Sequence, residues 1–212
     1  MDRWQLIRDE RADVLVFLKS LTAEQWTASS LCAGWSVKDV AVHLIVDDAV
    51  EELGVPKTLL KLAKWRFSVH RANTWWIEHN AGRSTESILA AFDKRLEPGR
   101  VLRTVGFESA LRAAIIHHQD MRRPLGMPRA IPLDRLQAVL AAIVTVKGSI
   151  NLGSRSRAKG LHLGASDVDW SHGEGPEVRG PGEAIMMALA GRGVAMADLE
   201  GDGTATLAER MR

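Results

Sequence analysis

The stretch CAGWSVKDVAVHL, residues 32–44, decides how this chain folds, because it contains both a turn and the start of an amphipathic helix. The turn signal is Cys32-Ala33-Gly34. Ser36 follows as an N-cap, and Asp39 stands at the third helical position, where its carboxylate can complete a capping box. We expect this helix to run to about Leu53, because a glycine and a proline follow it closely.

One face of this helix is polar although most of its residues are apolar. The apolar residues at positions 37, 40, 41, 44, 45 and 46 cover a wide arc, which predicts burial. His43 and Asp47 are four residues apart and therefore share one face. Trp35, just before the helix, is expected to anchor the core. Cys32 precedes the helix N-terminus, which could lower the pKa of its thiol and make it a nucleophile, but a packing role is favoured.

Helical periodicity continues along most of the chain. The expected helices cover residues 4–21, 22–26, 36–53, 57–80, 84–96, 107–123, 133–146 and 181–192. After Gly148 glycine and serine become frequent, and short alternating stretches at 161–163 and 168–170 give weak strand signals. The sequence therefore predicts a mainly α protein with a helical bundle over residues 1–150, followed by a small α/β domain over residues 151–212.

The composition excludes several classes of protein. Hydrophobic residues make up 46% of the chain, and 28 basic residues nearly balance 26 acidic ones, so a nucleic-acid-binding surface is not indicated. Cys32 is the only cysteine, which excludes an intrachain disulfide. No apolar run approaches the roughly 20 residues that a membrane-spanning helix needs, and the charged N-terminus lacks a signal-peptide core. We expect a cytoplasmic protein without a membrane partner.

The candidate metal ligands are His43 on one helix and His117 with Asp120 on another. Two ligands at i and i+3 on one helix, joined by a third from a facing helix, are typical of metal sites in bundles. By spacing alone these residues could equally be hydrogen-bonded helix residues, so the pattern permits a metal site without requiring one.

Two motifs give a family resemblance. Residues 32–44 resemble the first motif of the mycothiol-dependent maleylpyruvate isomerase family, and residues 117–126, HHQDMRRPLG, resemble its second. The sequence around Trp170, residues 173–181 and residues 190–192 is similar to the sterol-carrier-like domain of that family. The resemblance implies a DinB-like, up-down four-helix bundle followed by that small domain.

The resemblance also implies a function. It implies a divalent metal, usually zinc, that lowers the pKa of the mycothiol thiol, and a small electrophilic substrate that is isomerised or receives the thiol. His43 and His117 match two family ligands, but Ala113 stands where the family has a glutamate ligand. Asp120 or Asp47 is then the candidate replacement, and matching His118 instead places Ala114 at that position. Arg192 is the candidate for pairing with a carboxylate of the substrate or cosubstrate.

Three functions follow from these observations. The first is a metal-dependent and mycothiol-dependent isomerase or thiol transferase. The second, favoured by Ala113, is a non-catalytic small-molecule-binding protein with a degenerate metal site. The third, a nucleic-acid-binding regulator, is opposed by the near-neutral charge. The physiological substrate and the oligomeric state, a homodimer included, are left open by the sequence.

Overall fold

The computed structural model describes residues 2–45, 54, 56–57, 60, 63, 68–97, 99, 103, 106–145 and 153–211. By its internal contacts the chain divides into two compact units, residues 1–128 and 129–212. We describe each unit by itself. Asp47 lies outside the described residues. So do most of residues 57–68, the first half of the helix expected over 57–80.

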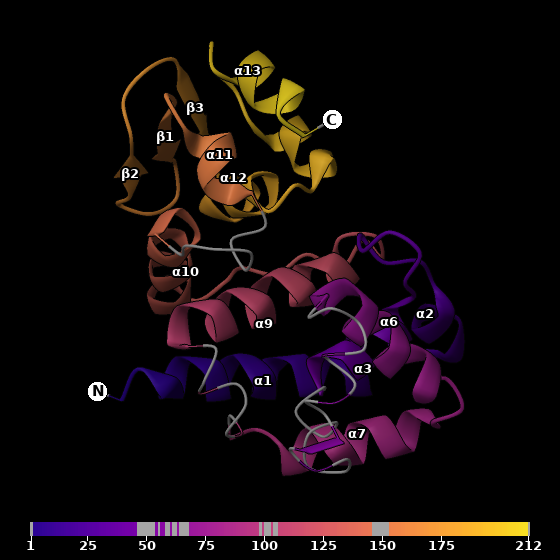
Figure 1. The fold of residues 1–212 in the computed structure, drawn as a ribbon. Helices are drawn as coiled ribbons and strands as arrows, with labels where there is room; N and C mark the ends of the chain where they lie inside the picture. The colour runs from indigo at the N-terminus through magenta and orange to yellow at the C-terminus, as the bar shows by residue number, and fades with distance from the viewer. Residues whose placement is uncertain are drawn as a thin grey trace. The chain divides into compact units, whose positions relative to one another are not determined.

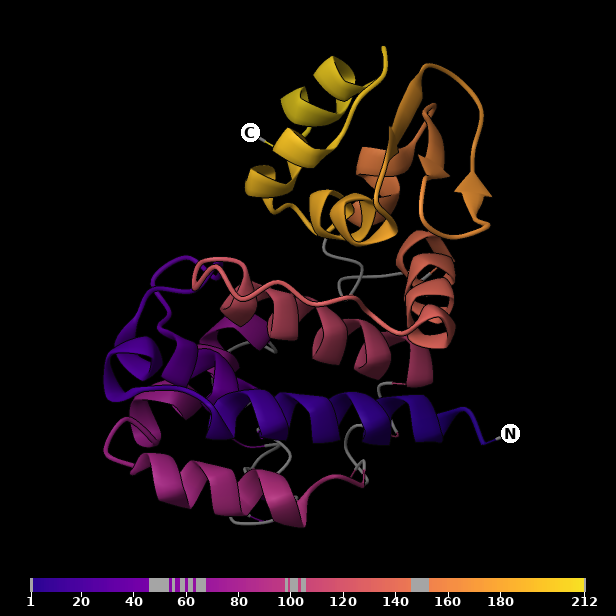
Figure 2. The same ribbon diagram turned by 180° about the vertical axis from the view of Figure 1, so that it is seen from behind.

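The first unit is a helical bundle. Its helices are α1 (Trp4–Lys19), α2 (Ala23–Thr27), α3 (Val37–Leu44), α6 (Val69–His79), α7 (Thr85–Lys94) and α9 (Phe107–Arg122). Helices α1 and α3 each contact both α7 and α9, so these four close a ring, and α6 packs on α3. Figure 1 and the reverse view in Figure 2 both show α1 lying between α9 and α7. The predicted four-helix bundle is confirmed.

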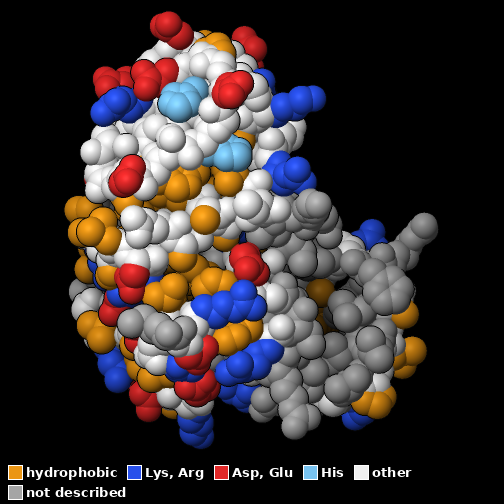
Figure 3. All heavy atoms as spheres, turned by 90° about the vertical axis from the view of Figure 1, so that its left-hand side faces the viewer, with side chains coloured by type: hydrophobic (Ala, Val, Ile, Leu, Met, Phe, Trp, Pro, Cys, Tyr) orange, Lys and Arg blue, Asp and Glu red, His pale blue; other side chains and the backbone are white. Residues whose placement is uncertain are grey.

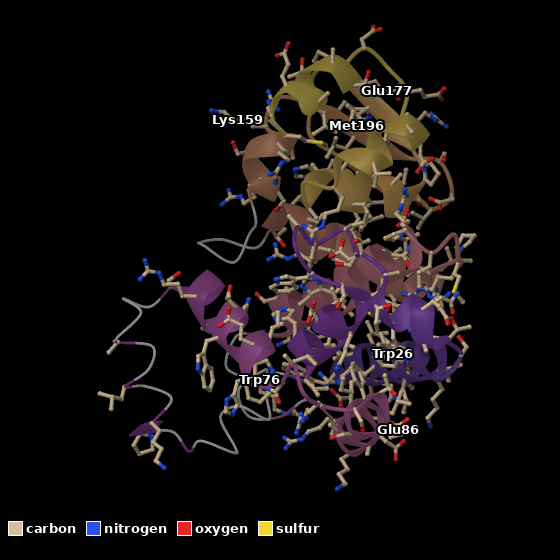
Figure 4. The ribbon with its side chains drawn as sticks, turned by 90° about the vertical axis from the view of Figure 1, so that its right-hand side faces the viewer. Trp26, Trp76, Glu86, Lys159, Glu177 and Met196 are labelled. Atoms are coloured by element: carbon tan, nitrogen blue, oxygen red, sulfur yellow. The ribbon has the colours of Figure 1, made fainter. Side chains whose placement is uncertain are left out.

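A continuous apolar core holds these helices together. Its largest fully buried side chains include Phe17, Trp76 and Phe92, all at most 1% exposed. Trp76 donates its indole N–H to the Val42 carbonyl oxygen at 3.0 Å, which ties α6 to α3 (Figure 4). Trp75 is only partly buried, so one of the two adjacent tryptophans faces the core, as the helical period requires.

The second unit combines helices with a small sheet. Its elements are α10 (Leu133–Thr145), α11 (Ser154–Ala158), β1 (His162–Ala165), β2 (Ser171–His172), β3 (Glu177–Gly180), α12 (Gly182–Leu189), a 3₁₀ helix η2 (Gly193–Asp198) and α13 (Thr204–Glu209). The strand order is β2-β1-β3, with β1 antiparallel to β2 and parallel to β3. The predicted α/β character of the C-terminal part is confirmed.

Helix α10 belongs to this second unit, although the sequence suggested a division at residue 150. The reason is its close packing against α12. A Cβ atom added to Gly182 would lie 2.9 Å from Cδ1 of Leu140 and 3.4 Å from Cδ1 of Leu136, so a larger residue at this crossing would require the Leu140 side chain to shift.

The strand expected at 168–170 is wrong. Residues 166–169 form bends, and the strand β2 follows them. The bend is fixed locally, because the Asp167 carboxylate accepts a hydrogen bond from the Gly182 amide at 2.8 Å and the Trp170 amide donates to the Val168 carbonyl at 2.8 Å. None of the described helices has the length and apolarity that crossing a membrane would require.

Candidate functional site

The two motif histidines meet where α3 packs against α9. His43 lies in the last turn of α3, and His117 lies on α9. Their ring centroids are 4.8 Å apart and the ring planes are nearly perpendicular, at 88°. The structure therefore brings together the two histidines that the sequence singled out.

Capping places the first of these histidines. The Ser36 hydroxyl accepts a hydrogen bond from the Asp39 amide at 3.2 Å, and the Asp39 carboxylate accepts from the Ser36 amide at 2.8 Å. This is the predicted capping box, and it fixes where α3 begins. His43, two turns later, is thereby set on the side of α3 that faces α9.

The Asp120 side chain, one turn after His117 on α9, contacts the His117 ring. The Oδ2 atom of Asp120 is 2.9 Å from Nδ1 of His117, and the Asp120 side chain is fully buried while that of His117 is 14% exposed. The i and i+3 spacing read from the sequence therefore produces a direct contact. A buried carboxylate so close to an imidazole orients the ring.

Cys32 completes this cluster, which the sequence interpretation missed. Its thiol donates to Oδ2 of Asp120 at 3.1 Å, and its Sγ is 3.6 Å from Nδ1 of His117. The loop is tied to α9 as well, because the Leu31 amide donates to the Asp120 carbonyl oxygen at 3.0 Å. Cys32 also packs at the edge of the apolar core, as expected. Its place at the head of the motif that carries His43 is the signal that could have identified it.

Among the described residues, one group of histidine, cysteine and acidic side chains brings three ligand atoms within 4.8 Å of one another. It consists of Cys32, His117 and Asp120. His43 is a neighbour of this group and not a member of it.

His43 sits in a nearly closed environment. Its ring lies 5.2 Å from that of Trp35, and its Nδ1 atom is buried without a hydrogen-bond partner among the described residues. Burial lowers the pKa of His43 to about 3, and repulsion by His117 adds to this effect while Asp120 opposes it. The imidazole is therefore neutral, and one ring nitrogen is available to a bound molecule.

The neighbouring histidine on α9 has a different task. His118 is fully buried, with Nδ1 2.8 Å from a carboxylate oxygen of Glu10 on α1. Arg122 donates from Nε to Nε2 of His118 at 2.8 Å, so the ring must carry its proton on Nδ1 and donate it to Glu10. His118 thus joins α9 to α1 and does not face His43.

The remaining predicted residues lack a suitable atom or belong to the other unit. Ala113 is one helical turn before His117 and offers no ligand atom. Arg192 belongs to the second unit, where its Nη1 donates to the Ala190 carbonyl oxygen at 2.8 Å. Its positive charge, together with burial, lowers the pKa of the nearby Arg157. The catalytic role of Arg192 stays a prediction.

Comparison with known proteins agrees with the motifs. The family model described as the mycothiol maleylpyruvate isomerase N-terminal domain matches residues 7–98. A comparison with curated proteins gave no match. A solved structure of the mycothiol-dependent maleylpyruvate isomerase is 14% identical, with a TM-score of 0.56, and covers 96% of this chain and 92% of its own. A variant of that isomerase with a histidine replaced by alanine is 15% identical, with a TM-score of 0.57 and the same coverage.

At such low identity the solved structures establish the fold alone, and the family model matches a part of the bundle. The segment from Ile7 to Pro98 contains the first motif with Cys32 and His43, whereas His117 and Asp120 follow it. The N-terminal part of the bundle therefore resembles the mycothiol maleylpyruvate isomerase N-terminal domain, and the chain shares its fold with the solved mycothiol-dependent maleylpyruvate isomerase structures.

Proposed function

We propose that this protein is a mycothiol-dependent enzyme that isomerises a small electrophilic substrate or transfers the thiol to it. The observation that carries this proposal is the meeting of His43 and His117, whose rings are 4.8 Å apart, beside a buried and unpartnered Nδ1 of His43. An isolated buried nitrogen of this kind costs free energy unless a ligand uses it. The matched N-terminal family supports mycothiol as that ligand.

The residues present can perform the proton steps of such a reaction. In the tautomer protonated on Nε2, the neutral His43 accepts the thiol proton of mycothiol on Nδ1. The thiolate formed beside the ring is an opposite charge that favours the imidazolium and offsets the burial that lowers the pKa of His43. The resulting thiolate adds to an activated C=C bond and converts it to a single bond, which can rotate. Expulsion of the same thiolate restores the double bond in the other geometry, and the proton returns from His43 to sulfur.

A divalent metal ion, with zinc the first candidate, fits the donor chemistry of this place. Sulfur, imidazole nitrogen and carboxylate oxygen are zinc ligands, and Cys32, His117 and Asp120 present one of each. From the sequence we expected His43, His117 and Asp120 as the ligand set. When bound, the ion would stabilise the thiolate form of the cosubstrate.

The other partners follow from the same reaction. Arg192 is the residue that we propose for pairing with a carboxylate of substrate or cosubstrate. Acidic and basic side chains are intermixed on the described part of the face in Figure 3, so this face has no extended basic patch of the kind that binds nucleic acid. We place the reaction in the cytoplasm, where a single reduced cysteine is stable.

A second function, non-catalytic binding of a small molecule, is favoured by one observation. Ala113 removes the expected glutamate ligand, and Cys32, His117 and Asp120 already satisfy one another by hydrogen bonds. In that case His43 would be a packing residue, and its replacement by alanine would leave ligand binding unchanged.

The test is a rate measurement on a panel of small α,β-unsaturated keto acids, with mycothiol, with glutathione and without thiol. We expect turnover only with mycothiol, and a loss of about 100-fold or more in His43→Ala, the usual cost of removing a proton-transfer group. His172→Ala, which changes an exposed histidine of β2, is the matched control and should keep the full rate. A rate that is independent of the thiol, or unchanged in His43→Ala, would contradict the proposal.

A further inference from the structure

Three side chains of different chemistry converge on one point in the first unit. Sγ of Cys32 lies 3.6 Å from Nδ1 of His117 and 3.1 Å from Oδ2 of Asp120. The nitrogen and the oxygen are 2.9 Å apart. The loop position is fixed independently of these contacts, because the Ser30 hydroxyl accepts from the Cys32 amide at 3.1 Å and donates to the Trp35 carbonyl oxygen at 2.8 Å. The loop that carries Cys32 and the helix that carries His117 and Asp120 are therefore each held in place before any ligand binds.

The contacts do not form a nucleophile–histidine–acid relay. In such a relay the nucleophile and the acid contact opposite nitrogens of the imidazole ring. Here Cys32 and Asp120 both contact Nδ1 of His117, and they also contact each other. A single nitrogen cannot pass a proton between them in relay, so the cluster needs another explanation.

The spacing of the three atoms suits a metal ion. With zinc–sulfur bonds of about 2.3 Å and zinc–nitrogen or zinc–oxygen bonds of about 2.0–2.1 Å, the edges of a tetrahedral face are about 3.3–3.6 Å long. The sulfur–nitrogen separation of 3.6 Å already has this length. The other two, at 3.1 and 2.9 Å, need to open by a few tenths of an ångström.

We propose that Cys32, His117 and Asp120 are the three protein ligands of a zinc-type metal site, with Cys32 supplying the ligand that Ala113 cannot. His43 stands beside this site and is not a ligand. Ion binding displaces the thiol proton of Cys32 to solvent, and the two negative charges of the thiolate and the carboxylate are balanced by the divalent ion. A fourth coordination position stays open.

The metal site supplies the ion that the proposed function uses, and the biological role of the site rests on that function. Its geometry does not depend on mycothiol, and neither does its test. A chain that binds the ion through Cys32 but turns over no substrate would refute the function alone. A chain that turns over substrate with mycothiol but forms no thiolate-to-cobalt band would refute the metal site alone.

The test uses full-length protein without a histidine tag, stripped with a chelator and titrated with Co²⁺. Cys32 is the only cysteine in the chain, so a thiolate-to-cobalt charge-transfer band in the near ultraviolet can come from no other residue. We expect one equivalent of Co²⁺ to produce this band in the wild-type protein and Zn²⁺ to abolish it by displacement. Absence of the band would overturn the proposal without any variant.

Variants then assign the ligands. Cys32→Ser should abolish the band, and Cys32→Ala and Asp120→Asn should weaken Zn²⁺ binding by more than the roughly 10–100-fold that loss of a supporting residue causes. His43→Ala should keep the band and the affinity within about threefold, because His43 is not among the three converging residues and its Nδ1 atom makes no hydrogen bond to any of them. Far-ultraviolet circular dichroism confirms that each variant is folded. Loss of binding in His43→Ala with retention in folded Cys32→Ser would overturn the proposed ligand set.

Discussion

His43 has a strongly lowered pKa in the candidate site. Its pKa falls to about 3 because burial penalises the imidazolium form, and because a nearby His117 disfavours a second positive charge. The carboxylate of Asp120 offsets only part of this. The folded protein therefore holds His43 neutral at a pH where an ordinary histidine would already carry a proton.

This shift predicts how stability depends on pH. Between pH 6.5 and about 3 the unfolded chain protonates His43 and the folded chain does not, so the free energy of unfolding must fall as the pH falls across this window. The contribution of one residue is at most about 1.4 kcal/mol per pH unit. Urea unfolding with a chelator present should show this slope in the wild type and a shallower one in His43→Phe. Identical slopes in the two proteins would contradict the assigned environment.

Residue identities in the site could be predicted only in part. His43 and His117 stand in recognisable motifs, and Asp120 follows by helical spacing, so the sequence identified all three. Cys32 could not be assigned to the site in this way, because a loop residue has no helical periodicity from which the helix that it contacts could be predicted. Its contact with Asp120 at 3.1 Å depends on the packing of distant segments.

At the scale of elements, the capping box of α3 links local sequence to the site. Replacing Ser36 with alanine removes the acceptor for the Asp39 amide and should lower the free energy of unfolding by about 1 kcal/mol. It should also reduce mycothiol binding, because α3 carries His43. Ser84→Ala is the matched control, since Ser84 caps α7 by accepting from the Ser87 amide.

Chemical denaturation and calorimetry check this pair of variants. The two should lose similar stability, while only Ser36→Ala should weaken the ligand. Equal mycothiol affinity in Ser36→Ala and Ser84→Ala would show that the start of α3 does not control the position of His43.

Long periodic elements were predictable, and short ones were not. Helices α1, α7, α9 and α10 lie within a few residues of the ranges expected from the sequence, because their apolar stripes extend over several turns. Strand β3, four residues long, was missed. Its stability comes from parallel pairing with β1, a long-range contact that no local pattern reports.

At the scale of the whole molecule, the chain is built from two compact units with separate cores. The described site residues Cys32, His43, His117 and Asp120 all belong to the unit of residues 1–128, and Arg192 belongs to the other. The family match covers the first of these units in large part, whereas the solved isomerase structures share the fold over 96% of the chain. A common fold with so few common residues leaves the cosubstrate to be tested directly.

The most direct test of the account is a calorimetric titration of mycothiol into the zinc-loaded chain. We predict that the wild type binds mycothiol at one site and that His172→Ala binds it with unchanged affinity. His43→Ala should bind at least about tenfold more weakly, which is equivalent to about 1.4 kcal/mol. No heat of binding in the wild type, or equal affinity in the wild type and His43→Ala, would contradict it.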